Sequence, residues 1–285
     1  MKATAITKQS GIASLSEVCN CFNIKRDAYY KYLRRFKQRK TVVMQVLEQV
    51  KKQRTEQPRV GTRKLYQTLQ PSFESAHIKV GRDCLFDILR DHNMLVKRKK
   101  AYHKTTNSYH HFHKYNNLIK ELKIIRPNQV WVSDITYIRT VKGFCYLALI
   151  TDLYSRKIVG YDISDSLELM GCLRALKSAL SKAHPATKLI HHSDRGVQYC
   201  SHMYVNQLKK RGIRISMTEE KHCYENAVAE RVNGILKDEF YLDQCFFSTK
   251  LAKKAAKNAI KIYNNKRLHL SLGYKTPNMI FEKIA

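Results

Sequence analysis

Two aspartates in the second half of this sequence occupy positions that suit metal chemistry. Asp134 lies inside the apolar run QVWVSDITYI, where a carboxylate is unfavourable unless a cation or hydrogen-bond donors compensate its charge. Asp194 directly follows the run KLIHHS, which is typical of a strand, and ligands of open α/β sheets gather at the carboxyl ends of strands. Each has an ordinary alternative, since backbone or arginine groups could satisfy Asp134, and Asp194 could cap a following helix. Their combination with a third acid favours a metal site.

The third acid lies in the segment CYENAVAERVNGILKDE, residues 223–239, which predicts an amphipathic helix. At about 100° per residue, a polar stripe places three side chains within about 60° of Glu230, namely Asn226, Asn233 and Lys237. Two small residues beside the stripe, Ala227 and Gly234, leave room for a large ligand. The apolar side chains lie opposite and predict the buried face: Val228, Val232, Ile235 and Leu236. Glu230 is therefore the catalytic candidate, and structural or flanking roles are predicted for Glu225, Asp238 and Glu239.

The elements that must position these acids begin near Asn128, where the hydrophobic pattern becomes that of an α/β domain. Residues 129–138, 144–153 and 157–164 predict three β-rich runs, and Asp152 is predicted to fix the turn between two of them. A helix over 168–183, a strand over 188–193, a helix over 202–212 and a strand over 213–217 follow. The helix of Glu230 completes the order βββαβαβα, and a long basic helix over 249–267 forms a tail. This order predicts a layered domain with a mixed sheet.

The first 100 residues predict short helices instead. SLSEVCNCFNIKRDAYYKYLRR favours two helices joined by a turn, with Ser16 as a cap and Val18, Cys21 and Phe22 on one face. A helix-turn-helix that enters the major groove and a plain helical hairpin both fit this pattern. RRFKQRK then predicts a basic connector, and residues 41 to about 96 predict a compact three-helix DNA-binding unit. The polar stretch after VKRKK predicts an extended basic linker.

Composition favours a polyanionic partner. The 285 residues carry 53 basic and 23 acidic side chains, a formal net charge of +30. Nucleic acid is the expected partner, because no apolar run approaches the roughly 20 residues of a membrane-spanning helix. The first residues lack the apolar core and cleavage site of a signal peptide, which favours a cytoplasmic protein. The eight cysteines are scattered without a CxxC pair and favour reduced thiols over a zinc site.

Asp134, Asp194 and Glu230 form a D…D…E set in which residues 195–229 separate the last two. Around them stand WVSDITYI, SRKIVGY, HHSDRGVQY, ENAVAER, LKDE and YNNKRLHLSLGYKTP. With these motifs the sequence resembles the DDE transposases that carry a retroviral-integrase-like (rve) catalytic core. It is most similar to the second-frame (OrfB) product of insertion-sequence family three. The resemblance is strong from about residue 128 to 284 and is also visible upstream, in TEQPRVGTRKLYQTLQ.

The resemblance implies a fold and a domain order. We expect a catalytic core of RNase H-like fold, a mixed five-stranded sheet flanked by helices, preceded by a helical DNA-binding region. The expected boundaries are 1–40 for a helix-turn-helix-like segment, 41–100 for the helical DNA-binding domain, 101–127 for the basic linker and 128–285 for the core with its helical tail. Two departures from the family pattern occur: Glu225 stands where the family usually has Asp, and Arg231, Val232 and Asn233 replace its usual Ser and aromatic pair.

The implied activity is cleavage at the ends of an insertion sequence followed by strand transfer. Three carboxylates can hold two Mg²⁺ ions, for which Mn²⁺ can substitute, about 4 Å apart around a scissile phosphate. Asp134 and Asp194 are the expected main ligands, and Glu230 completes the second site. Lys237 is expected to contact DNA phosphate or terminal base pairs. Further DNA-positioning candidates are Arg195, Gln198, Tyr199, Asn226, Asn233, Arg267 and His269.

The implied partners are double-stranded DNA, as terminal inverted repeats and as target, and further copies of the chain on that DNA. The family also implies a fusion or an association with an upstream-frame product. A membrane partner is not expected. The expected location is the bacterial cytoplasm, on the nucleoid. Two alternatives remain: an RNase H-like nuclease that cuts without joining, and a non-catalytic DNA-binding regulator derived from a transposase.

Overall fold

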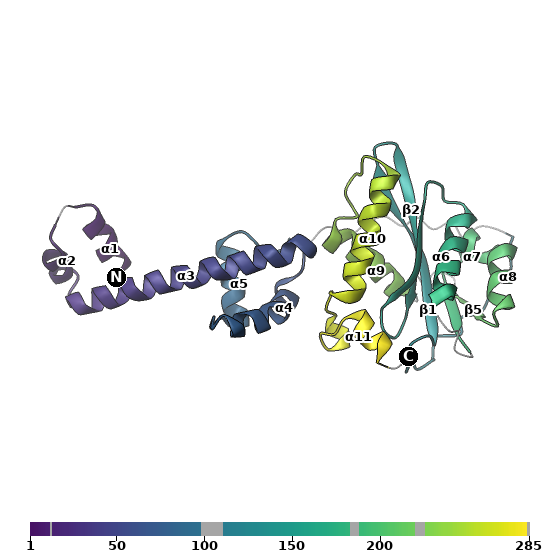
Figure 1. Ribbon diagram of the computed structural model, residues 1–285, viewed down its shortest axis with the longest axis horizontal. Coiled ribbons are helices and arrows are strands. Elements are labelled where there is room, and N and C mark those ends of the chain that lie inside the picture. Colours follow the sequence, from purple (N-terminus) through teal and green to yellow (C-terminus); the bar gives the residue numbers. More distant parts are fainter. Residues whose placement is uncertain (12, 98–110, 183–187, 220–225, 284–285) are drawn as a thin grey trace. The chain divides into compact units, whose positions relative to one another are not determined.

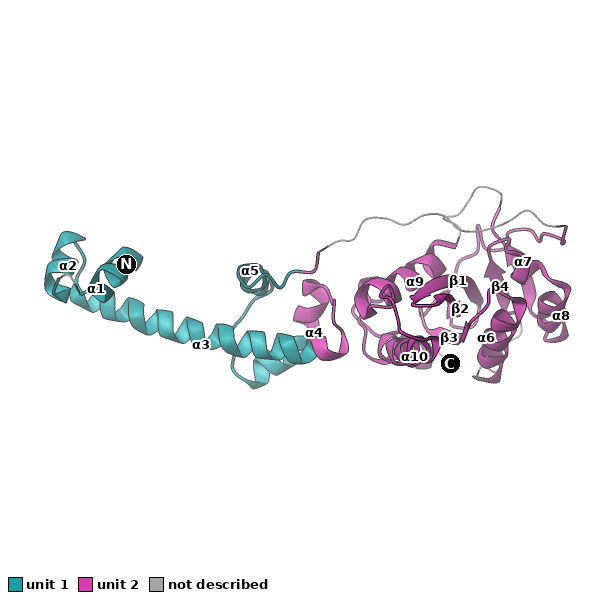
Figure 2. Ribbon diagram, turned by 90° about the horizontal axis from the view of Figure 1, so that it is seen from above, with its two compact units in different colours: residues 1–53, 68–95 teal, residues 54–67, 96–285 magenta. Residues whose placement is uncertain are grey.

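The computed structural model describes residues 1–11, 13–97, 111–182, 188–219 and 226–283. The chain divides into two compact units (Figure 2), one of residues 1–53 and 68–95 and one of residues 54–67 and 96–285. Each unit is described by itself below. Among the described residues, no helix is both long enough and apolar enough to cross a bilayer.

The first unit is helical. Helices α1 (Lys2–Gln9) and α2 (Leu15–Cys21) pack against each other and precede α3 (Arg26–Glu56). A capping box begins α2, in which Ser14 and Glu17 exchange side-chain and backbone hydrogen bonds. The cap is therefore Ser14 and not Ser16 as predicted. Of the predicted apolar face, Val18 is buried, together with Cys19, whereas Cys21 and Phe22 are exposed.

Helix α3 runs without interruption through the predicted basic connector and through the predicted domain boundary at residue 40. The connector RRFKQRK contains no glycine or proline, and arginine, lysine and glutamine are good helix formers, so nothing there ends the helix. The predicted three-helix region then uses the end of α3 together with α4 (Thr62–Ser75) and α5 (Arg82–Asp91). The predicted face of α5 is confirmed as buried, at Leu85, Ile88 and Leu89.

The second unit contains the sheet. Its strands are β1 (Val130–Thr140), β2 (Gly143–Asp152), β3 (Ile158–Ser164), β4 (Ile190–Ser193) and β5 (Arg214–Met217), in the spatial order β3-β2-β1-β4-β5. The β1–β2 and β2–β3 pairs are antiparallel, and the β1–β4 and β4–β5 pairs are parallel. At the turn between β1 and β2, Gly143 adopts a φ of +119°, which side-chain-bearing residues rarely adopt. The predicted mixed five-stranded sheet is confirmed.

Helices cover both faces of the sheet (Figure 1). One face packs on α6 (Leu169–Lys182), α7 (Val197–Cys200) and α8 (His202–Lys210), through strand residues that include Trp131, Ala148 and Ile150. The other face packs on α9 (Ala227–Phe240) and α10 (Thr249–Asn265), through residues that include Leu147 and Leu149. The alternation along β2 follows from the two-residue period of a strand. The predicted arrangement, a mixed five-stranded sheet flanked by helices and preceded by a helical region, is therefore confirmed.

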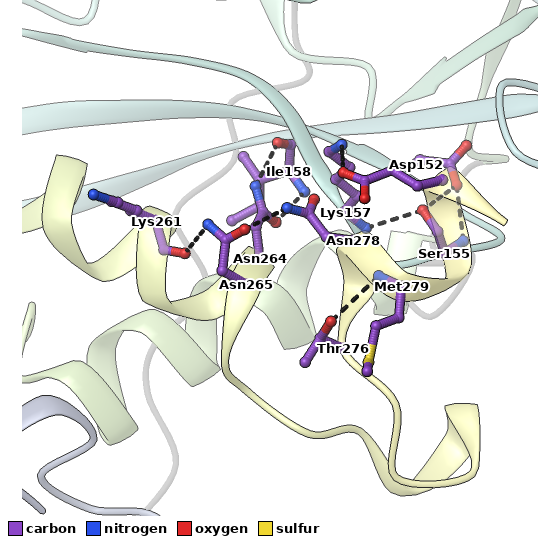
Figure 3. A network of polar contacts seen from close by, with 11 residues as sticks. Asp152, Ser155, Lys157, Ile158, Lys261, Asn264, Asn265, Thr276, Asn278 and Met279 are labelled. Carbon is purple, nitrogen blue, oxygen red and sulfur yellow. Dashed lines mark hydrogen bonds and ion pairs between the residues drawn. The ribbon is translucent and has the colours of Figure 1, made fainter. Parts of the chain in front are cut away.

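The C-terminal motif YNNKRLHLSLGYKTP fastens the tail to β3 and its neighbours (Figure 3). The Asn264 side chain accepts from the Ile158 N–H and donates to the Ile158 carbonyl. Asn278, on α11 (Pro277–Glu282), donates to the side chain of Asn265, and Thr276 caps α11. The predicted role of Asp152 is confirmed, because its buried carboxylate accepts from the Ser155 N–H and hydroxyl in the β2–β3 turn.

The predicted basic linker over 101–127 differs from the structure in its second part. Residues 101–110 lie outside the described residues. From His111 onward the chain lies on the core: Phe112 and Tyr115 pack on the α6–α8 side, and Ile119 and Leu122 pack beside β1 and β4. Apolar side chains at these positions give the segment a surface to bury, so it is not a solvated linker.

Candidate active site

The register of β1 against β4 brings the two aspartates to neighbouring positions. Val132 pairs with His192 and Ser133 pairs with Ser193 in this parallel ladder. Asp134 is the next residue along β1, and Asp194 directly follows the last residue of β4. Neighbouring strands of a sheet lie about 4.8 Å apart. Both side chains are half-buried. The sheet therefore presents two carboxylates side by side at the carboxyl end of β4.

Helix α9 is attached to β1 at this point by two asparagines. The Asn226 side chain donates to the Ser133 carbonyl at 3.0 Å, and Asn233 Nδ2 donates to Asp134 Oδ2 at 2.7 Å. Glu230 lies between them on the same stripe of the helix and is exposed. The opposite face is buried as predicted, at Val232, Ile235 and Leu236. The two amide contacts thus hold Glu230 beside the strand that carries Asp134.

The charges of the three acids act on one another. The pKa of Asp134 is raised to about 7, chiefly by burial and then by the negative charge of Asp194, with a smaller contribution from the charge of Glu230. The hydrogen bond from Asn233 and the N–H of Ile135 oppose this shift. A carboxylate with such a pKa is incompletely compensated by the protein, and a cation beside it would favour its ionised form.

The donor chemistry fits a hard divalent cation, since carboxylate oxygens are the ligands that Mg²⁺ prefers. Within the described ranges, however, no three His, Cys, Asp or Glu side chains are already gathered closely enough to form a metal-binding group. One aspartate also has a local partner, because Asp194 Oδ1 accepts the Gly196 N–H just ahead of α7.

Lys237 lies one turn beyond Asn233 on the same stripe and is half-buried. Burial lowers the pKa of Lys237, whereas the negative charges of Asp134 and Asp238 raise it. The ammonium group is therefore within electrostatic range of the acidic site. Arg195 follows Asp194 directly and is also half-buried.

Five of the predicted DNA-positioning residues lie in the interior of the fold instead, and one of them, Tyr199, is buried in the core on the α6–α8 side. Asn226 and Asn233 are 3% and 5% exposed and bind β1 as described above. Arg267 is 4% exposed, and its guanidinium makes two 2.8 Å hydrogen bonds to the Glu239 carboxylate. His269 is buried against the Tyr263 ring, and burial lowers its pKa to about 3. We therefore drop Arg267 and His269 as DNA contacts and assign the two asparagines to positioning.

The Glu239 carboxylate is the centre of an ion cluster that the sequence reasoning missed. Lys64 Nζ lies 2.7 Å from Glu239 Oε1, the same oxygen that accepts one of the two hydrogen bonds of Arg267. The Arg59 N–H also donates to the Glu239 carbonyl, so residues 54–67 are joined to the end of α9 within the second unit. The available signal was the position of Glu239 on the apolar side of the helix, where an acid requires a buried partner.

A second missed group involves Ser133, the residue before Asp134 on β1. The His191 Nε2 atom contacts the Ser133 hydroxyl at 2.7 Å and the Tyr204 hydroxyl at 3.0 Å, all in the interior. Burial lowers the pKa of His191 to about 3, so the imidazole is neutral. The polar group fixes the strand position next to Asp134 without adding charge. The predicted departure at Glu225 lies outside the described residues.

Known proteins resemble this chain along nearly all of its length. Two integrase core domain models match residues 125–223 and 211–277. The chain is 34% identical over 272 residues to the insertion element IS600 uncharacterized 31 kDa protein of Shigella sonnei, covering 93% of this chain and 98% of that protein. It is 29% identical to transposase InsF for insertion sequence IS3A of Escherichia coli strain K12, covering 99% of each. Among solved structures, the chain is similar to the HTLV-2 integrase catalytic core in complex with magnesium, at 18% identity and a TM-score of 0.45. The match covers 56% of this chain and 99% of the HTLV-2 chain.

Proposed function

Since this chain belongs to the insertion-sequence family three (IS3) transposases with an integrase core domain, we propose that it binds the ends of an insertion sequence and catalyses metal-dependent cleavage and strand transfer of DNA. The observation that carries the proposal is the placement of three acids on separate elements: the β1–β4 register sets Asp134 beside Asp194, and the Asn233 hydrogen bond holds the helix of Glu230 against β1. Asp134 on β1 is affected by the charges of Asp194 after β4 and Glu230 on α9. An arrangement that raises a carboxylate pKa in this way is unfavourable for stability alone and suits a cation-binding catalytic site.

Asp134 and Asp194 would be the main ligands of Mg²⁺, and Glu230 would complete the site from α9. When bound, two such ions supply an activated water or 3′-hydroxyl and stabilise the leaving oxygen of the scissile phosphate. Asn233 fixes one oxygen of Asp134 through its 2.7 Å hydrogen bond. Lys237 would attract the DNA phosphate next to the acids. The nucleophiles are water and then the freed 3′-hydroxyl, so no covalent protein–DNA intermediate is required.

The helical first unit supports recognition of the DNA ends. We assign end binding to α1–α5, with the core acting on DNA that those helices hold. The net charge of +30 supports tight, salt-dependent attachment to duplex DNA. We further propose that several copies of the chain assemble on the DNA in the bacterial nucleoid, and that an upstream-frame product can be fused to it or associate with it.

The test uses purified chain, Mg²⁺ and a duplex that ends in the terminal inverted repeat of the element. Labelled products distinguish the functions: joined strands support the transposase, and cleavage alone would indicate an RNase H-like nuclease. Binding without any strand cleavage would indicate a regulator. The same duplex with scrambled ends is the control, because an end-specific enzyme leaves it intact.

A further inference from the structure

A row of lysines follows the outer face of α10, the helix that precedes the C-terminal motif. The exposed side chains Lys250, Lys253, Lys254, Lys257 and Lys261, here called the α10 lysine ridge, fall within about 100° of arc on this helix. The residues that α10 buries against the sheet lie on the opposite side and include Ala256, Ala259 and Tyr263. The ridge therefore faces away from the core over a length of about 16 Å.

The charge pattern of α10 is unfavourable for the helix itself. Its 17 residues, TKLAKKAAKNAIKIYNN, include no acid. Three pairs of lysines stand four residues apart and repel each other, and Lys250 lies in the first turn, where the helix dipole favours negative charge. Within the described ranges of the chain, none of the five takes part in an ion pair. A helix selected only for solubility would mix both signs of charge.

We infer that the α10 lysine ridge is a binding surface for the phosphate backbone of duplex DNA, and specifically for target DNA. This inference rests on the proposed strand-transfer function. A duplex carries about one negative charge per 1.7 Å, so about 16 Å of it offers more phosphates than the ridge has lysines. Lysine is a point charge that contacts phosphate without reading bases. A surface made of lysines alone suits the DNA whose sequence the protein does not need to recognise.

The test variant is Lys253→Gln/Lys254→Gln/Lys257→Gln, because glutamine keeps the helix propensity and removes three charges. Its matched control, Lys177→Gln/Lys188→Gln/Lys210→Gln, removes three exposed charges from the second unit outside α10. Binding to a random-sequence duplex is measured by fluorescence anisotropy across a salt series. In the ridge variant, the negative slope of log K against log salt concentration should become shallower by up to about 2.7, because each lost phosphate contact removes about 0.9. The control variant should keep the slope of the original chain.

Strand transfer into the same duplex supplies the second readout. With pre-cleaved end DNA, the ridge variant should show a higher KM for target DNA and an unchanged kcat, while cleavage of uncut ends stays normal. An unchanged slope and KM, or equal losses in ridge and control variants, would overturn the inference. A changed oligomeric state of the ridge variant on size-exclusion chromatography would also overturn it, in favour of a subunit interface. If the original chain neither cleaves nor joins but the slope difference persists, the ridge stands as a DNA surface and the proposed function fails.

Discussion

The Asn233 side chain donates a 2.7 Å hydrogen bond to Asp134, which joins helix α9 to strand β1 at the centre of the candidate site. The other carboxylate oxygen of Asp134 accepts the Ile135 N–H. Asp134 therefore has a fixed orientation before any metal or DNA binds.

Asn233→Ala should reduce strand transfer without preventing DNA binding. Loss of the amide frees the Asp134 carboxylate to rotate, and residues that orient metal ligands typically contribute about 10–100-fold in metal affinity or activity. The half-saturating Mg²⁺ concentration should rise, and Asn233→Ser should recover part of the loss. Asn258→Ala, at an exposed position of α10, is the matched control. Equal Mg²⁺ dependence in Asn233→Ala and the original chain would show that the hydrogen bond has no positioning role.

Asp134→Asn should stabilise the metal-free protein at alkaline pH. The pKa of Asp134 rises from 3.8 to about 7, chiefly through burial and then through the charge of Asp194. The folded state thus binds this proton more tightly than the unfolded chain, and stability falls as pH rises through that interval. Removing the ionisable group should recover about 1–3 kcal/mol of unfolding free energy at pH 8.

Thermal melts at pH 5 and pH 8 without metal measure this difference. The gain should be clearly larger at pH 8 than at pH 5, and exposed Asp165→Asn should change neither melt. Mg²⁺ should raise the Tm of the original chain more than that of Asp134→Asn. A variant that is less stable than the original chain at pH 8 contradicts the account of the buried charge.

Lys237→Ala should weaken binding to end DNA and lower its salt slope by about 1, which corresponds to one lost phosphate contact. The contact is expected because Lys237 lies within electrostatic range of Asp134 on the stripe of Glu230. Lys237→Arg should restore most of the binding, since it keeps the charge. Anisotropy titrations over a salt series measure the slope, and an unaltered slope in Lys237→Ala would remove this residue from the DNA path.

Glu239→Gln should destabilise the second unit by roughly 3–5 kcal/mol, because it leaves Lys64 and Arg267 without their buried acid. Burial by itself would raise the pKa of Glu239, but the hydrogen bond and charge of Arg267 and the charge of Lys64 lower it. A lowered folded-state pKa contributes stability above the unfolded value of 4.5, and that contribution is lost as pH falls through the folded-state pKa.

Chemical denaturation at pH 7 and at acid pH measures the effect. The difference between the original chain and Glu239→Gln should shrink as pH falls. Glu56→Gln is the matched control, because its ion pair with Lys266 is exposed and contributes at most about 1 kcal/mol. Similar effects of the two substitutions at pH 7 would mean that the Glu239 cluster is an ordinary surface pair.

Much of the core could be predicted from the sequence because hydrophobic periodicity determines which face of each element is buried. The strands of Asp134 and Asp194 and the buried face of α9 follow from that periodicity alone. Contacts between residues that are distant in sequence do not follow from periodicity. Glu239 binds Lys64 from 175 residues away, and nothing in the polar run around Arg267 distinguishes an interior arginine from a DNA contact. A helical wheel gave the angle of Asn233 but not the strand that it faces.

The ends of the helices were harder to predict for a related reason. The run RRFKQRK is as compatible with a helix as with a basic connector, because charge pattern alone does not end a helix. Ser14 and Ser16 are both good caps by residue type, and only Ser14 has Glu17 three positions later to complete a capping box.

The most direct test of the central claim is strand transfer by three charge-neutralised variants in the presence of Mg²⁺. Asp134→Asn, Asp194→Asn and Glu230→Gln should each lose cleavage and joining while keeping affinity for end DNA. Asp238→Asn, an acid on the same helix outside the stripe, should keep both reactions. The account is contradicted if any of the three variants joins DNA at the rate of the original chain.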